Sequence, residues 1–164
     1  MISAISHSNP YYNSPYLNRN NYACTSCLLP TYGRNYCIFD KEEVDYFVNQ
    51  GEKAIPVLTN ILARSNNEPQ IVEALHIFNK MLDNGVKGID KLYPYFSRFN
   101  YSPSDNIQSY LSGIYRKTQI KEAFGPLVKM MIQNSMKPVK NPFFDVNEET
   151  GGAVLSYISA QFRK

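Results

Sequence analysis

Three stretches of the chain repeat one pattern of small, apolar and leucine residues. They begin at Ala54, Gly88 and Ala123, so the second follows the first after 34 residues and the third follows the second after 35. Each stretch reads small, apolar, two variable positions, Leu, two variable positions and two apolar residues, as in AIPVLTNIL, GIDKLYPYF and AFGPLVKMM. Self-similarity at a period of this size is typical of stacked helical repeats. The pattern therefore predicts an all-α fold built from repeated helical units.

Helix start and stop signals place the first unit. Asp40 is a favourable N-cap for a first helix that ends near Gly51, and the next helix is expected from about Glu52 to Ala63. Asn67 is expected to cap its antiparallel partner, which stops at Gly85. The apolar face of this partner recurs 36 residues later in the chain, in Ile71, Leu75 and Phe78 and then in Ile107, Leu111 and Ile114. Both members of the helical hairpin are therefore repeated.

The later helices follow from the same spacing. Ile89, Leu92, Phe96 and Phe99 are expected on one helix, whose partner starts at the Ser104-Asp105 signal. A third helix of the first type is predicted from about Gln119 to Asn134. A last helix is predicted around Ala153 to Phe162, with an apolar set that covers the end of the stack: Val154, Leu155 and Ile158.

The chain divides into two parts near Asp40, its first acidic residue. Residues 1–38 are rich in Asn, Tyr, Ser and Pro, show no helical or strand period, and hold few aliphatic side chains to offset the entropy cost of ordering. We predict a disordered tail over residues 1–38 and a helical repeat domain over residues 39–164. The spaced tyrosines of the tail could dock on a partner or fold back on the repeat domain.

The opening Gly51-Glu52-Lys53-Ala54-Ile55-Pro56-Val57-Leu58, echoed by Gly85-Val86-Lys87-Gly88-Ile89-Asp90-Lys91-Leu92, resembles HEAT-type repeats of the armadillo-like α-solenoid class. The resemblance covers roughly residues 40 to 136. It implies a short α-solenoid of stacked antiparallel hairpins whose second helices line a concave face that binds proteins or peptides. The exposed side chains expected on that face are Glu73, His76, Lys80, Ser109, Ser112, Tyr115 and Arg116. The same residues would also suit an ordinary solvated helix face.

Charge and hydropathy narrow the function classes. The chain has 17 basic and 14 acidic residues, a net charge of +3, which gives no strong electrostatic footprint for nucleic acid. No sequence segment approaches the length of an apolar membrane span, and a cytoplasmic protein is expected. A basic region from Arg116 to Lys140 with tyrosines nearby keeps nucleic-acid binding as an alternative. An enzyme is a further alternative, because HEAT-like bilin lyases and DNA glycosylases exist, although the sequence contains no recognised catalytic motif.

The cysteines are the one group that hints at chemistry. Cys24 and Cys27 have the C-x-x-C spacing of a zinc site, Cys37 follows, and His7 is the nearest candidate for a fourth ligand. The alternative is a set of ordinary thiols in the tail. We expect no catalytic residue, no metal and no cofactor, and we interpret the chain as a non-catalytic protein-interaction module or scaffold.

Overall fold

The computed structural model describes residues 39–138 and 146–163, and the described part contains helices and no strand. The helices are α1 (Lys41–Gln50), α2 (Ile55–Arg64), α3 (Glu68–Asp83), the single-turn α4 (Tyr93–Phe96), α5 (Asp105–Thr118), α6 (Phe124–Ser135) and α7 (Val146–Gln161). Short 3₁₀ turns lie at Gly51–Ala54, Ile89–Leu92, Ser97–Phe99 and Lys121–Ala123. The all-helical prediction is confirmed. The predicted tail over residues 1–38 lies outside the described residues.

The three repeated stretches share one local conformation. At each of them a 3₁₀ turn leads into an α-helix with a proline in its first turn, at Pro56 in α2, Pro94 in α4 and Pro126 in α6. Proline has no N–H group to donate to the preceding turn, and its fixed φ angle suits the first turn of a helix. The repetition seen in the sequence is therefore also a repetition of backbone structure.

The start and end signals hold for several helices. The Asp40 carboxylate accepts a hydrogen bond of 2.9 Å from the Glu42 N–H at the start of α1, and Gly51 ends this helix with a φ of +55°, which favours glycine. Asn67 stands at the N-cap of α3, but its side chain makes no capping hydrogen bond. Instead the Ser65 hydroxyl accepts from the Asn67 N–H at 3.1 Å.

Two helix boundaries differ from the prediction. The helix expected through Ile89 and Phe99 is broken into 3₁₀, α and 3₁₀ turns. Pro94 cannot donate to the carbonyl four residues before it, which separates α4 from the 3₁₀ turn that precedes it. The last helix starts at Val146 rather than near Ala153, so Gly151 and Gly152 lie within it. Only Val154 of its predicted covering residues is buried; Leu155 and Ile158 are exposed.

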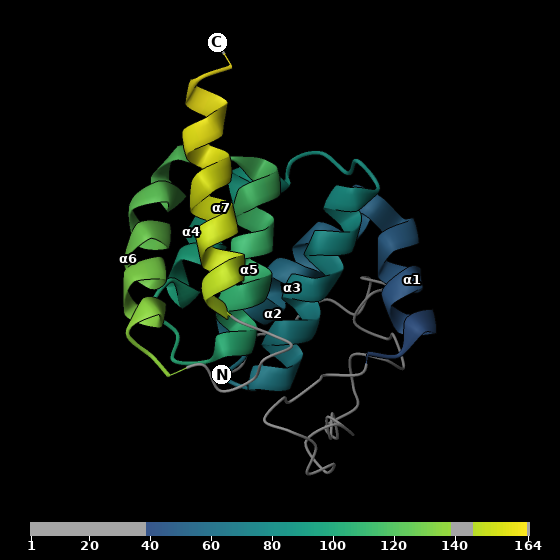
Figure 1. Ribbon diagram of the computed structural model, residues 1–164. Helices are drawn as coiled ribbons and strands as arrows, with labels where there is room; N and C mark the ends of the chain where they lie inside the picture. Colours follow the sequence, from purple (N-terminus) through teal and green to yellow (C-terminus); the bar gives the residue numbers. More distant parts are fainter. Residues whose placement is uncertain (1–38, 139–145, 164) are drawn as a thin grey trace.

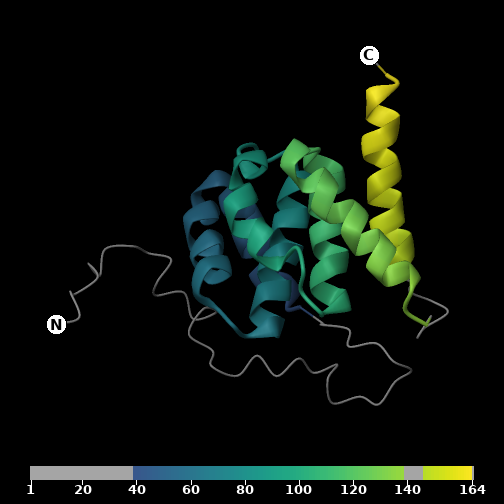
Figure 2. The ribbon, with the colours of Figure 1, turned by 90° about the vertical axis from the view of Figure 1, so that its left-hand side faces the viewer.

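α1, α3, α5 and α7 pack against one another in this order, while α2 contacts α3 and α4, and α6 contacts α7. Figure 1 shows α1 at one side of the molecule and α6 at the other, with α7 in front beside α6, and in Figures 1 and 2 the last turns of α7 project beyond the other helices. One cluster of buried residues extends from Val44 in α1 to Tyr157 in α7. The predicted core residues that recur at the 36-residue offset all belong to it: Ile71, Leu75, Phe78, Ile107, Leu111 and Ile114.

The contact between α3 and α5 is close because α5 carries a glycine there. A Cβ atom added at Gly113 would stand 2.8 Å from the Asn79 Oδ1 atom of α3. The Asn79 amide donates to the Tyr110 carbonyl of α5 at 2.8 Å and to the Leu75 carbonyl of its own helix at 3.2 Å. This buried asparagine therefore ties the two helices together at the point where their backbones approach.

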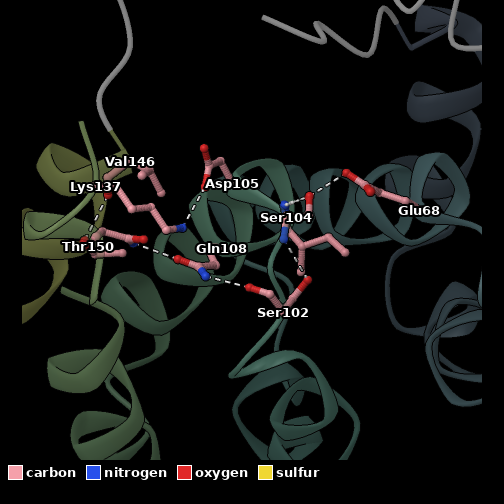
Figure 3. A network of polar contacts seen from close by, with 10 residues as sticks. Glu68, Ser102, Ser104, Asp105, Gln108, Lys137, Val146 and Thr150 are labelled. Atoms are coloured by element: carbon pink, nitrogen blue, oxygen red, sulfur yellow. Dashed lines mark hydrogen bonds and ion pairs between the residues drawn. The ribbon is translucent and has the colours of Figure 1, made fainter. Parts of the chain in front are cut away.

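Polar contacts also connect the starts of α3 and α5 with the end of α6 (Figure 3). The Ser104 hydroxyl before α5 donates to Glu68 at the start of α3, and Lys137, just after α6, pairs with Asp105 at 3.1 Å. The starts of α3 and α5 thus lie at the same end of the molecule, and α6 ends where α5 begins. α3 and α5 therefore run in the same direction, and α6 runs antiparallel to α5.

Candidate functional site

A hollow of about 320 Å³ opens between α1 and α3. Its lining combines apolar, basic, acidic and aromatic side chains: Phe39, Lys41, Val44, Asp45, Val48, His76, Lys80 and Asn84. Two of the predicted contact residues, His76 and Lys80, therefore lie in one concave place. A volume of this size is at the lower end of small-ligand sites and holds one or two side chains of a partner.

Two of the lining residues, Phe39 and His76, carry stacked rings, and a third ring from α5 packs against both. The His76 ring stacks on Phe39 with centroids 4.6 Å apart and an interplanar angle of 23°. Tyr110 of α5 meets the His76 ring edge-on at 5.4 Å and lies 6.2 Å from Phe39. Paired rings in these geometries stabilise one another beyond the area that they bury. The aromatic wall of the hollow is therefore made by Phe39, before α1, and His76 of α3, with Tyr110 of α5 packed against them.

The electrostatics keep this wall neutral. Burial first, and then the charges of Lys80 and Lys117, lower the pKa of His76 to about 4, against an opposing effect of Asp83. His76 is therefore uncharged at neutral pH and offers a flat ring instead of a cation. Lys117 pairs with Asp83 at 2.7 Å, whereas the exposed Lys80 has no ion pair among the described residues.

Three of the predicted contact residues are not exposed, so the expectation of their exposure is wrong. Tyr115 is 0% exposed, and its hydroxyl donates to Asn100 Oδ1 at 2.6 Å. Ser112 is also 0% exposed and donates to the Gln108 carbonyl at 2.7 Å. Glu73 is 6% exposed. The reason is that α3 and α5 each have neighbours on two sides, so a wider part of their circumference is covered than one apolar stripe implies.

The other predicted residues remain accessible but do not form one patch. Ser109 is half-buried and Arg116 is exposed, and neither lines the hollow beside α1. Sequence reasoning missed Phe39 and Val44 as lining residues of the hollow, and Tyr110 as a ring packed against His76. The signal that could have found Phe39 is its place directly before the Asp40 cap, where an apolar residue commonly packs back on its helix.

A pair of buried carboxyl groups lies between the same two helices. Glu43 of α1 is 3% exposed, and both it and Glu73 line a small interior space of about 10 Å³. Burial first, then repulsion by Glu43 and Asp40, raises the pKa of Glu73 from 4.5 to about 8. A carboxyl group that titrates near neutrality can act as a general acid or base. This space is, however, large enough for about one water molecule and for no substrate.

The basic region from Arg116 to Lys140 is divided by ion pairs. Lys117 pairs with Asp83 at 2.7 Å and Lys137 with Asp105 at 3.1 Å. Lys129 stands over the Tyr101 ring at 5.9 Å, and Lys140 lies outside the described residues. The arrangement offers separate cations instead of a continuous track for phosphates.

Within residues 39–138 and 146–163, no three His, Cys, Asp or Glu side chains gather as a metal site would require. Cys24, Cys27, Cys37 and His7 lie outside the described residues. None of the described helices has the length and apolar character of a membrane span. Comparison with models of known protein families, with curated proteins and with solved structures found no match to this chain.

Proposed function

We propose that this chain is a non-catalytic protein-interaction module, and that the hollow between α1 and α3 receives a short segment of a protein partner. The observation that carries the proposal is the lining of the hollow, in which a neutral aromatic wall stands beside a lysine without an ion pair among the described residues. Exposed concave sites with apolar walls and a few placed charges are typical binding sites for side chains of a partner.

The architecture that would present this site is a short HEAT-like α-solenoid. Support comes from the repeated 3₁₀ turn and proline-initiated helix in all three stretches, and from the serial packing of α1, α3, α5 and α7. In such a stack the second helices form a rigid face, so that binding requires little backbone ordering.

The chemistry of the hollow defines the segment that fits it. An aromatic or branched aliphatic side chain of the partner would enter beside Phe39 and His76, and its dispersion contacts with the rings supply the anchor. A carboxylate next to that anchor would pair with Lys80 and Lys41. The proposed ligand is therefore a short peptide with an apolar anchor and an adjacent acidic residue.

Selection from a random-peptide display library on the immobilised full chain tests this proposal. Enriched peptides should share the apolar and acidic pair, and Lys80→Glu should weaken their binding about tenfold or more through charge repulsion. Lys53→Glu is the matched control because Lys53 is an exposed lysine in the turn before α2. If no peptide is enriched, or if the affinity is unchanged in Lys80→Glu, the proposal is refuted.

Nucleic-acid binding through the exposed Arg116, Lys121 and Lys129 is the second candidate, favoured by the Lys129–Tyr101 contact. Neutralising phosphates releases counterions, so binding of this kind weakens steeply with salt. Titration of a labelled single-stranded oligonucleotide at two salt concentrations measures it. If no oligonucleotide binds at low salt, nucleic-acid binding is refuted.

A HEAT-like lyase or glycosylase activity has less support still. The carboxyl group with a raised pKa described above, Glu73, lies in a space without room for a substrate.

A further inference from the structure

The outward face of α7 is apolar. Leu155 is 66% exposed, Ile158 42% and Phe162, directly after the helix, 84%. These residues follow one another at intervals of three and four, which places them in one stripe. The stripe lies opposite the buried face of α7, formed by Val146, Thr150, Ala153, Val154 and Tyr157. Exposed apolar residues that gather in this way mark an interaction surface.

The stripe continues toward the start of the helix as small and acidic residues. Gly151 and Glu148 precede Leu155 at intervals of four and three, so Glu148, Gly151, Leu155, Ile158 and Phe162 occupy the alternating positions of a coiled-coil seam. A Cβ atom at Gly151 or at Gly152 would meet no atom within 4 Å. The packing of this chain on itself therefore does not require either glycine, although glycine weakens a helix relative to alanine.

The apolar end of the stripe lies where α7 extends past its neighbours (Figures 1 and 2). A hollow of about 380 Å³ opens there beside the start of α6, lined by Lys121, Phe124, Tyr157, Ile158, Gln161 and Phe162. The Phe124 and Tyr157 rings stack at 5.5 Å and form its floor. The last turns of α7 thus expose both a ridge of large side chains and an apolar hollow beside it.

We propose that α7 pairs antiparallel with α7 of a second copy of this chain. In an antiparallel seam, Phe162 of one copy lies against Gly151 of the other, and Leu155 lies against Ile158. The largest side chain then meets the smallest, and the glycines provide the space that Phe162 needs. A parallel pair would set Phe162 against Phe162 and leave Gly151 against Gly151, which packs poorly.

Charge favours the same orientation. Glu148 and Glu149 lie in the first turn of α7, and the exposed Arg163 follows its last turn, with Lys121 beside the hollow. Antiparallel pairing brings the acidic end of each copy to the basic end of the other, whereas parallel pairing opposes like charges. The face is therefore complementary to itself, as an isologous two-fold interface must be.

α1 lies at the other end of the series α1, α3, α5 and α7, and its surface explains why α7 of one copy pairs with α7 of the second copy and not with α1. The outward side of α1 carries charged and amide side chains, with Lys41, Glu42, Asp45 and Asn49 all exposed. A head-to-tail stack would bury these polar groups against the apolar stripe of α7 without partners. A closed dimer through α7 covers the stripe on both copies and leaves the polar ends in water.

Sedimentation velocity of the full chain from low to high micromolar concentration tests the proposal. We expect a monomer–dimer equilibrium whose dissociation constant rises at least about tenfold in Leu155→Glu, since two charges would be placed in the seam. Met136→Glu is the matched control, because Met136 is 79% exposed at the end of α6 and outside the stripe. Far-UV circular dichroism checks that each variant keeps its helices.

Charge reversal tests the orientation and does not depend on the folding of Leu155→Glu. The double variant Glu148→Lys/Glu149→Lys should weaken the dimer, and adding Arg163→Glu to the same chain should restore it, because only antiparallel pairing brings these positions together. A chain that stays monomeric at every concentration overturns the proposal and leaves the stripe for a different protein. A dimer unaffected by Leu155→Glu, or a triple variant without recovery, overturns it as well.

Discussion

Replacing Glu73 by glutamine should stabilise the protein at neutral pH. Glu73 is 6% exposed, and burial together with Glu43 and Asp40 raises its pKa from 4.5 to about 8. At pH 7 the unfolded chain has released this proton while the folded chain still holds it, so folding requires proton uptake. Glutamine keeps the size of the side chain and carries no charge, which removes this requirement.

The magnitude follows from the two pKa values. One unit of difference corresponds to about 1.4 kcal/mol, and pH 7 lies 2.5 units above the unfolded value of 4.5. The carboxyl group therefore costs about 3 kcal/mol at pH 7 relative to a neutral side chain, and about 5 kcal/mol above pH 8, where the full difference applies. The folded pKa of Glu73 is raised, so the contribution of this group to stability is most favourable below pH 4.5 and is lost as pH rises toward 8.

Urea denaturation followed by far-UV circular dichroism at several pH values measures this effect. Glu73→Gln should raise the free energy of unfolding by about 3 kcal/mol at pH 7 and by less than about 1 kcal/mol at pH 5. Glu52→Gln is the matched control, because Glu52 is exposed in the turn before α2. An equal gain at both pH values, or a loss at pH 7, would show that the proton linkage of Glu73 is not as described.

Three further predictions use the same folding assay or proton NMR. Gly113→Ala should lower the free energy of unfolding by about 1 to 3 kcal/mol, since the added Cβ would lie 2.8 Å from the Asn79 Oδ1 atom. The control Gly125→Ala, with open space around it, should raise it by up to about 1 kcal/mol. Equal effects of the two changes would contradict the close approach of α3 and α5. Tyr115→Phe should lower the free energy of unfolding by about 1 to 2 kcal/mol, because the Asn100 Oδ1 atom would lose its buried 2.6 Å hydrogen bond. An unchanged free energy of unfolding would refute this. His76 should titrate by NMR near pH 4, and stability should fall as pH drops from 6.5 through 4, because the depressed pKa opposes protonation of the folded chain; a midpoint near 6.5 would show that the ring is solvated.

The sequence predicted most of the helices because their signals are local. The Asp40 cap, Gly51 and the prolines act within one turn of the positions that they define, so α1, α2 and α3 begin and end close to the expected residues. The broken helix around Pro94 was missed because apolar spacing alone was weighed there, without the N–H group that proline lacks. The start of α7 was missed because Gly151 and Gly152 weaken a helix locally, whereas Thr150 and Ala153 on either side of them are buried within it.

The candidate site was predicted only in part, because the sequence of a helix does not show that a second side of it is covered by another helix. His76 and Lys80 were expected on the face that the resemblance implies and do line the hollow, but Glu73 of α3 and Tyr115 of α5, expected on the same face, are buried. A polar side chain at a buried position requires a partner on another element, such as Asn100 for Tyr115. The identity of that partner depends on long-range packing, which the period of a single helix does not contain.

On α7 the difference between sequence and burial is reversed, because apolar residues rather than polar ones are found on the unexpected side: Leu155 and Ile158 are exposed. α3 contacts both α1 and α5, and α5 contacts both α3 and α7, so a helix inside the row has two flanks covered by neighbours in that row. α7 has apolar residues on both its buried face and its outward face, which is the composition of an inner helix. Within the described residues, however, only one flank of α7 in the row is covered, by α5, while α6 packs beside it. A second copy of α7 would supply the missing neighbour, and the glycines at 151 and 152 supply the room for its approach.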